Sequence, residues 1–177
     1  RFSFRQSVGV TLGHDERVCG ALASLKEHFK VKKVFYDFKK KKIGDLVFKN
    51  LALDKYYTNS NDRSSIIYVT INHLNYLFTG DISKEVESDL YQTYHHLDVD
   101  VLKVAHHGSK NSTTKSFLEE FQPQKAIISA GKNNLYGHPH KETIKKLQKN
   151  GADIYGTLWG GAIIIESDGQ KYKINYF

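Results

Sequence analysis

Each of three successive apolar strands in this sequence is followed by residues that can bind a metal ion or move a proton. These residues are Asp81, the adjacent pair His106 and His107, and His138. Catalytic groups collect on loops at the ends of strands, where a rigid scaffold positions them. Zinc and harder divalent cations bind His and carboxylate, and a bound water then becomes hydroxide near neutral pH. The pattern therefore predicts a metal-dependent hydrolytic site at these strand ends.

The histidine pair raises a question of orientation. Adjacent residues on an extended chain face opposite sides of a sheet. In regular strand geometry we therefore expect at most one of His106 and His107 to point into the site. The other would orient a ligand or contact the substrate. The sequence leaves open which of the two is the ligand.

Composition limits the class of protein. With 177 residues, of which 40% are hydrophobic, the chain can bury one core, which predicts a single domain over 1–177. The net charge of +7 favours a polyanionic partner such as nucleic acid or an anionic surface. The lysine run 39–42 fits either a solvated turn between strands or a patch that contacts phosphate. A single cysteine, Cys19, excludes a thiolate zinc cage.

Hydrophobic periodicity predicts alternating strands and helices, which is typical of an α/β fold. Strands are expected over 7–12, 31–36, 46–48, 51–53, 65–71, 76–78, 100–104, 126–129, 153–155, 162–166 and 172–177, with 46–48 and 51–53 forming a hairpin. Helices are expected over 20–29, 83–94, 115–121 and 141–151. No stretch approaches the roughly 20 apolar residues that span a bilayer, so we expect this segment to be soluble.

Some residues are set apart from the predicted site. Trp159 lies among glycines near a closing turn, where packing is the first interpretation and stacking on a base the alternative. His28, His95 and His96 lie on helix or loop segments away from the strand ends, and we interpret them as surface residues.

Four motifs of the chain, taken in order, resemble the metallo-β-lactamase-like domain of the ComEC family of DNA-uptake proteins, which act in natural competence. They are residues 61–65 (NDRSS), 78–81 (FTGD), 102–109 (LKVAHHGS), and 128–131 (ISAG) with 134–139 (NLYGHP). The resemblance implies an αβ/βα sandwich with the site along one edge, of which this chain is the later two-thirds. It also implies two divalent metal ions, zinc or manganese, and a phosphodiesterase or nuclease that acts on DNA, in particular on a single strand.

The resemblance also implies roles for individual residues. Asp81 bridges the metal ions and takes part in catalysis, and either His106 or His107 is a metal ligand. His138 acts on the substrate phosphate. Ser109 and Tyr136 lie nearby and line the substrate side.

The first metal motif departs from the family pattern. The family has the form His-x-His/Asp-x-Asp-His before a glycine-rich helix start, whereas residues 13–18 read GHDERV. In this alignment only Asp15 occupies a ligand position, so it provides what remains of the first site; His14 and Glu16 would serve only if the loop were shifted by one residue. Arg17 places positive charge beside a cation, which disfavours metal binding, and suits a phosphate instead. We therefore expect two metal ions if this loop completes the first site, and one or none if it does not.

The chain also lacks the family's opening strands with their Gly-Gln-Gly-Asp turn, so we expect a domain that is incomplete at its N-terminal end. Exposed sheet edges would then favour a homodimer. As part of a longer ComEC-like protein, the domain is expected to lie on the outer face of a membrane, beside a channel domain. Three functions stay open: an active metal-dependent phosphodiesterase, a degenerate domain that binds nucleic acid or a partner without hydrolysis, and a remnant without activity.

Overall fold

The computed structural model describes residues 38–167 and 171–177. In chain order the elements are β1 (Lys40–Ile43), β2 (Leu46–Asn50), η1 (Asn61–Arg63), β3 (Ile67–Ile71), β4 (Leu74–Phe78), α2 (Lys84–Thr93), β5 (Val101–Lys103), η2 (Ala105–Gly108), α3 (Lys115–Phe121), β6 (Lys125–Ile128), α4 (Lys141–Lys149), β7 (Asp153–Gly156), α5 (Thr157–Gly160), β8 (Ile163–Ser167) and β9 (Tyr172–Tyr176). Strands and helices alternate from β4 to β8, so the predicted α/β class is confirmed.

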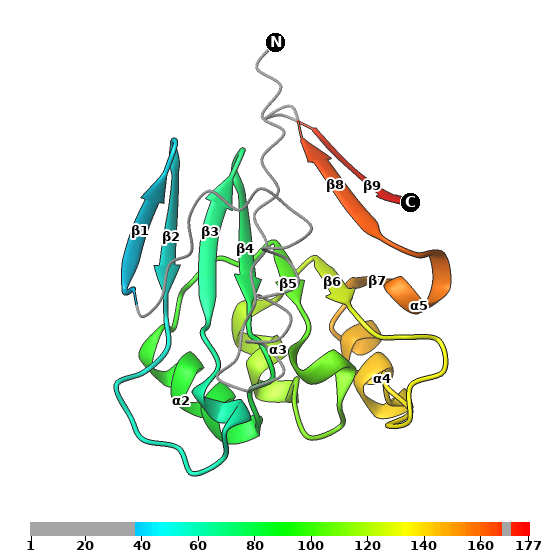
Figure 1. Cartoon of the computed structure of the whole chain (residues 1–177), viewed down its shortest axis with the longest axis horizontal. Helices are drawn as coiled ribbons and strands as arrows, with labels where there is room; N and C mark the ends of the chain where they lie inside the picture. The colour runs from blue at the N-terminus through cyan, green and yellow to red at the C-terminus, as the bar shows by residue number, and fades with distance from the viewer. Residues whose placement is uncertain (1–37, 168–170) are drawn as a thin grey trace, which may run out of the picture.

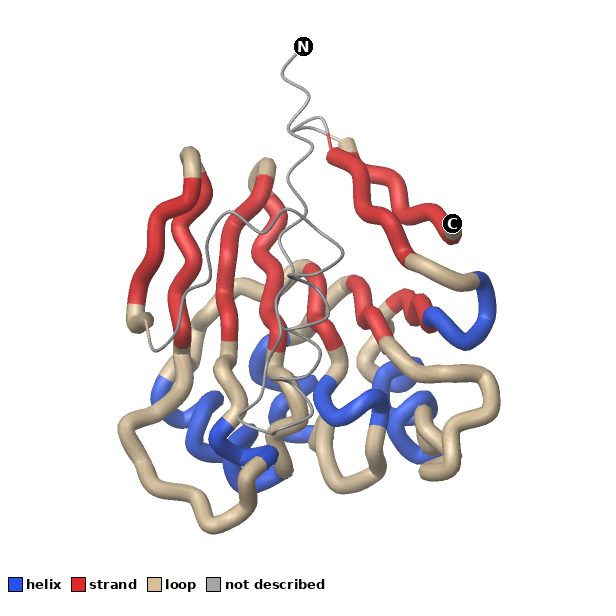
Figure 2. The backbone as a smooth tube through the Cα atoms, viewed as in Figure 1, coloured by secondary structure: helices blue, strands red, loops and turns tan. Residues whose placement is uncertain are grey.

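One sheet contains β1 to β7 in chain order, and β8 and β9 form a separate hairpin (Figures 1 and 2). The pairs from β1 to β4 are antiparallel, and the pairs from β4 to β7 are parallel. Parallel neighbours need a crossover, and α2, α3 and α4 supply the three that are required. Because parallel strands run in the same direction, the carboxyl ends of β4, β5 and β6 share one edge of the sheet.

The three crossover helices pack side by side against one face of the sheet (Figure 1). Leu77 and Leu102 are register partners in β4 and β5 and point into this helix-covered core. Their neighbours Tyr76 and Val101 belong to a second apolar cluster on the opposite face. The strands β4 and β5 are therefore apolar on both faces, as expected for the parallel part of a sheet.

Caps fix the ends of the helices. Ser83, the residue expected to begin this helix as its N-cap, caps α2 through a hydrogen bond that its hydroxyl accepts from the backbone N–H of Glu85. Thr114 caps α3 in the same way, accepting from Phe117. Gly151, just beyond α4, has a φ of +80°, a conformation that favours glycine at this position.

The predicted hairpin of 46–48 with 51–53 is wrong. Instead, β1 pairs with β2 across a two-residue turn at Gly44 and Asp45, and Gly44 has a φ of +59°. Asn50 ends β2, because its side-chain oxygen accepts hydrogen bonds from the backbone N–H groups of Ala52 and Ile66. Three of the four lysines of the run, Lys40 to Lys42, are therefore in a strand rather than a turn, with Lys40 and Lys42 exposed.

Several predictions fall on residues outside the described ranges: the strands over 7–12 and 31–36, the helix over 20–29, and the site residues Asp15 and Arg17. Where the structure describes the chain, no helix is both long enough and apolar enough to cross a membrane. The single domain over 1–177 and the pairing of two copies at a sheet edge stay predictions.

Candidate functional site

The loops that follow β4, β5 and β6 meet at the shared edge of the sheet. The backbone N–H of His106, after β5, donates to the carbonyl of Gly80, after β4, over 3.0 Å. The side chain of Thr79 donates to the carbonyl of Lys103 over 2.9 Å. These bonds hold the Asp81 loop against the histidine loop, which brings the first two predicted motifs together.

Both histidines of the pair leave the extended conformation. In η2, His106 has φ and ψ of 48° and 45°, and His107 has 55° and 20°. Two successive left-handed residues turn the chain sharply, so the alternation of a strand does not apply to them. The strand geometry on which the expectation of a single inward ring was based is therefore absent here, and the rings of His106 and His107 both lie near the ring of His138, at 5.6 and 6.3 Å between ring centres.

His107 is fixed between a carbonyl and a carboxylate. Its Nδ1 lies 2.7 Å from the backbone oxygen of Ser129, after β6. Since a carbonyl only accepts, Nδ1 carries the hydrogen, and in the neutral ring Nε2 keeps a free lone pair. That Nε2 lies 3.7 Å from Oδ1 of Asp81, and both side chains are partly exposed to solvent. The pair therefore offers an imidazole nitrogen and a carboxylate oxygen at one point on the surface.

His138 lies at the centre of a group of aromatic rings. Tyr136 stacks on it at 5.7 Å between ring centres, and His140 meets it edge-on at 4.8 Å. Burial, together with the neighbouring His140 and His106, lowers the pKa of His138 below its usual range. Its ring is therefore neutral at neutral pH and can accept a proton.

Asn134 holds His138 in place. The Asn134 side-chain oxygen accepts from the backbone N–H of His138 over 2.8 Å, and its amide donates to the carbonyls of His138 and Gly131. Gly108 packs closely against the same loop: a Cβ atom at this position would lie 2.6 Å from Cβ of Pro139. Only glycine permits this close approach of the η2 turn to the His138 loop.

Ser109 is a predicted site residue that is buried and does not lie beside Asp81, His107 and His138 on the surface. It is 3% exposed, and its hydroxyl accepts from the backbone N–H of Asn111. Its carbonyl accepts from the hydroxyl of Thr143 in α4 over 2.9 Å. In the described structure these contacts anchor the η2 turn to α4.

Two residues near the site were not predicted from the sequence. His140 lies two positions beyond His138, and its Nδ1 accepts from the backbone N–H of Lys110. Lys103 is the last residue of β5; burial lowers the pKa of its ammonium group, and the nearby Asp81 opposes this shift. The sequence signal for His140 was its spacing of two residues from His138. The signal for Lys103 was its position at the end of an apolar strand.

The fit of a metal ion depends on how many ligands converge. Asp81 and His107 provide two groups of the right type, and the hydrogen bond from Nδ1 of His107 to a backbone oxygen is how metal-binding histidines are commonly oriented. Among residues 38–167 and 171–177, no set of three His, Cys, Asp or Glu side chains is grouped to hold a metal. Asp15, the third predicted ligand, lies outside these ranges.

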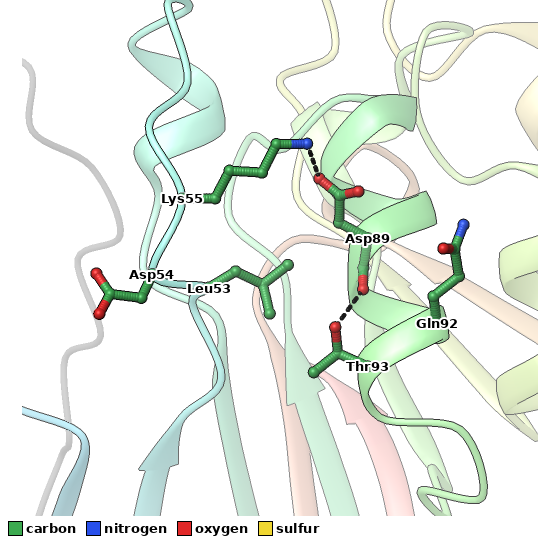
Figure 3. A pocket seen from close by; sticks show the side chains of 6 residues that line it. All are labelled: Leu53, Asp54, Lys55, Asp89, Gln92 and Thr93. Carbon is green, nitrogen blue, oxygen red and sulfur yellow. Dashed lines mark hydrogen bonds and ion pairs between the residues drawn. The ribbon is translucent and has the colours of Figure 1, made fainter.

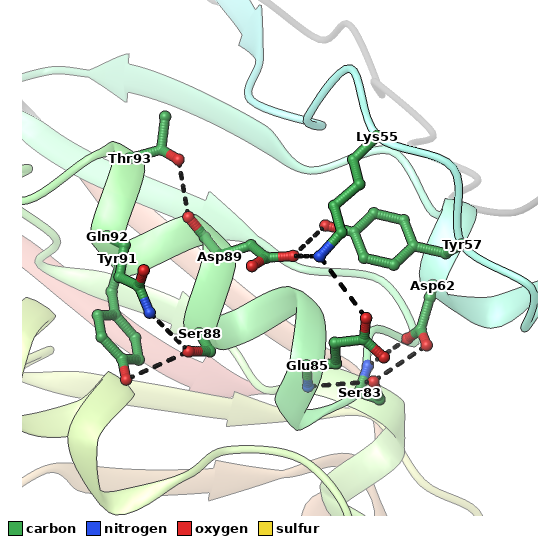
Figure 4. Close-up of polar contacts among 10 residues, drawn as sticks. All are labelled: Lys55, Tyr57, Asp62, Ser83, Glu85, Ser88, Asp89, Tyr91, Gln92 and Thr93. Atoms are coloured by element: carbon green, nitrogen blue, oxygen red, sulfur yellow. Dashed lines mark hydrogen bonds and ion pairs between the residues drawn. The ribbon is translucent and has the colours of Figure 1, made fainter.

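A second polar cluster lies on the other side of α2, away from the strand ends. Figure 4 shows Lys55 and the hydroxyl of Tyr57 both donating to Asp89, at 2.6 and 2.7 Å. Lys55 and Asp89 also border an open depression of about 370 Å³, which Figure 3 shows from close by. Since Lys55 and Asp89 neutralise each other, we interpret this cluster as the attachment of the 51–60 loop to α2.

Comparisons with known proteins give related sequences but no matching family model. The chain is 39% identical to ComE operon protein 3 of Bacillus subtilis over 105 residues, 59% of this chain. It is 33% identical to Recombination protein 2 of Haemophilus influenzae over 66% of the chain. It is 30% identical to Competence protein ComA of Neisseria gonorrhoeae over 59% of the chain.

The matched stretches cover 14%, 14% and 15% of those three proteins. The chain is therefore similar to competence proteins of the ComEC family over about 60% of its length, and it spans about one seventh of the relatives it matches.

Proposed function

We propose that this chain is the metallo-β-lactamase-like part of a DNA-uptake protein of the ComEC type, and that the residues at the shared strand edge hydrolyse a phosphodiester of DNA. The similarity to competence proteins supports the role in uptake. The meeting of three strand-end motifs at one edge supports the fold and the place of the site. In this proposal the described sheet, with α2, α3 and α4, is one half of an αβ/βα sandwich.

The observation that carries the proposal is the fixed orientation of His107 beside Asp81. The hydrogen bond to Ser129 leaves Nε2 of His107 as the acceptor that faces the carboxylate of Asp81. A divalent cation, zinc or manganese, would be held by these two residues together with Asp15. When bound, it would polarise the phosphodiester and lower the pKa of a bound water.

The remaining residues have separate tasks in this proposal. His138 is kept neutral by burial and by its histidine neighbours, so it can take a proton from the attacking water or hydrogen-bond to the phosphate. Tyr136 is 72% exposed and stacked on His138, which suits contact with the sugar or base beside the reacting phosphate. The ring of His106 meets the ring of His138 edge-on, with 5.6 Å between ring centres, and in this role it positions His138.

We also propose that the domain works within a longer, membrane-associated protein. The relatives are about seven times longer than the matched stretch, which leaves room in them for further domains. The partners in this proposal are a DNA strand and a membrane-channel domain of the same protein.

The first experiment measures cleavage of a labelled single-stranded oligonucleotide by the full chain with added Mn²⁺ or Zn²⁺. Asp81→Asn keeps the size of the side chain and the backbone hydrogen bond from Asp81 to Ser64, so the fold is expected to stay intact. We expect it to abolish metal-dependent cleavage and to lower the metal content measured by elemental analysis. The matched control is Asp45→Asn in the exposed β1–β2 turn, which should cleave like the unaltered chain.

Cleavage that survives Asp81→Asn would refute the proposed site. An absence of cleavage combined with salt-dependent DNA binding would favour the non-catalytic alternative, a domain that binds nucleic acid without hydrolysis. The net charge of +7 is the observation that favours this alternative.

A further inference from the structure

A groove of about 460 Å³ opens directly beside His138. It lies between the loop that follows β6, one face of α4, and α5, which gather on the same side of the molecule (Figure 1). His138 belongs both to the groove and to the candidate site, so the two are continuous. The groove lining consists of Lys132, Asn134, Gly137, His138, Pro139, Lys141, Ile144, Lys145, Gln148, Leu158 and Trp159.

The charge of the groove has one sign. Lys132, Lys141 and Lys145 are exposed and line it, whereas its lining contains no carboxylate. Lys141 and Lys145 are one turn apart on α4, so both ammonium groups belong to the same face of the helix. Glu142, on the same helix, interacts electrostatically with Lys145 but does not line the groove. Three cations against this single carboxylate suit a ligand that carries several negative charges along its length.

Trp159 adds an aromatic surface to this groove. Its side chain is 50% exposed, which is unusual for a tryptophan of a folded domain. The buried part of the indole packs on Gly156, where a Cβ atom would lie 2.7 Å from both Cε3 and Cζ3. The hydroxyl of Thr157 contacts Ala130 through two hydrogen bonds, of 3.0 and 2.9 Å, which join α5 to the end of β6. The indole is therefore held in a fixed position with part of its surface open.

We propose that this groove binds a single DNA strand and leads it to the site, with one base stacked on Trp159 and phosphates on Lys132, Lys141 and Lys145. Lysines beside an exposed aromatic ring are the combination that binds single strands without regard to sequence. A duplex is disfavoured, because a paired base does not offer its face to the indole. The inference rests on the proposed function in taking a DNA strand as the substrate that reaches His138.

The test uses the fact that Trp159 is the only tryptophan of the chain. Titration of the full chain with a deoxythymidine oligomer is expected to quench its intrinsic fluorescence in a saturable way. In a separate anisotropy assay with a labelled oligomer, Trp159→Ala should weaken binding roughly 5- to 140-fold, the range that one stacked base gives. Trp159→Phe keeps an aromatic face and should retain most of the affinity, which also controls for folding.

The lysines are tested by the dependence of binding on salt. Three phosphate contacts on a single strand predict a slope of about −2 for the logarithm of the binding constant against the logarithm of salt concentration, from about −0.7 per contact. Lys145→Ala should reduce the steepness by about 0.7. Lys149→Ala removes the same charge from the same helix but outside the groove, and should leave the slope close to that of the unaltered chain.

Three outcomes would overturn the inference: binding without quenching, equal affinity of Trp159→Ala and the unaltered chain, or equal binding of a duplex or an acidic peptide. The readouts also separate it from the proposed function. Cleavage that depends on Asp81 but not on Trp159 would refute strand binding in the groove and support the proposed hydrolytic site. DNA-strand binding that depends on Trp159, without any cleavage, would support the groove as a binding site and refute the proposed hydrolysis.

Discussion

Glu87 in α2 is a buried carboxylate on which the geometry of the site depends. It is 0% exposed, and its two oxygens accept the backbone N–H groups of Thr113 and Thr114. Thr113 has a φ of +54°, so this loop is held in a conformation that few threonines adopt. The loop connects the η2 turn to α3, and Ser112 within it donates to the carbonyl of Ile82 next to Asp81.

Glu87→Gln replaces one accepting oxygen by an amide that only donates, with little change of volume. One of the two backbone N–H groups then loses its partner in a buried place, which costs about 1–3 kcal/mol of unfolding free energy. Urea unfolding followed by circular dichroism measures the difference. Glu85→Gln on the exposed side of the same helix is the control, and should stay within about 0.5 kcal/mol of the unaltered chain.

The pH dependence gives a second measurement. Burial raises the pKa of Glu87, and the hydrogen bonds from Thr114 and Thr113 only partly oppose it. The folded state therefore holds this proton more tightly than the unfolded state, so the contribution to stability is full below the ordinary pKa of about 4.5 and is lost as the pH rises through the folded value. The advantage of the unaltered chain over Glu87→Gln should accordingly shrink from pH 5 upward. A gap that widens with pH, or Glu87→Gln as stable as Glu85→Gln, would refute the reasoning.

Two further predictions concern single contacts. Gly108→Ala should destabilise the fold by about 1–3 kcal/mol in urea unfolding, because the new Cβ meets Pro139 at 2.6 Å and the residue has a φ of +85°. Gly151→Ala is the matched control, because Gly151 has a φ of +80° but nothing within 4 Å of an added Cβ; equal losses would contradict the close approach. Tyr57→Phe should cost about 1.5–3 kcal/mol of unfolding free energy, since it removes a hydrogen bond to the charged Asp89; an unchanged unfolding midpoint would mean that Asp89 does not depend on Tyr57.

The parallel part of the fold was predictable because each element there carries a strong local signal. Apolar runs predicted β4, β5 and β6, and the helices expected over 83–94 and 115–121 are found as α2 and α3. The edge strand β1 was missed, since half of its residues face solvent and its lysines read as a turn. Local pattern does not distinguish an exposed edge strand from a polar loop.

The candidate site was predictable in its residue types but not in its geometry. Strand order brings Asp81, His107 and His138 together, and strand order follows from the alternation of strands and helices. The left-handed turn at His106 and His107 is fixed by bonds to Gly80 and Ser129, which lie far away in the sequence. The exposure of Trp159 likewise depends on its packing against Gly156 and on the position of α4. The sequence immediately around Trp159 does not predict either of them.

The contact between Thr157 and Ala130 has a consequence for local opening. The last rung of the β6–β7 ladder joins Ile128 to Gly156, and the Thr157 side chain, by bonding both backbone groups of Ala130, continues that ladder past the end of both strands. We therefore expect the amide of Ala130 to be protected from hydrogen exchange as a strand amide is, although it lies in a loop. We expect the loop to fluctuate mainly at its tip around Leu135, which is 99% exposed, while the carbonyl of Ser129 keeps its place beside the imidazole of His107.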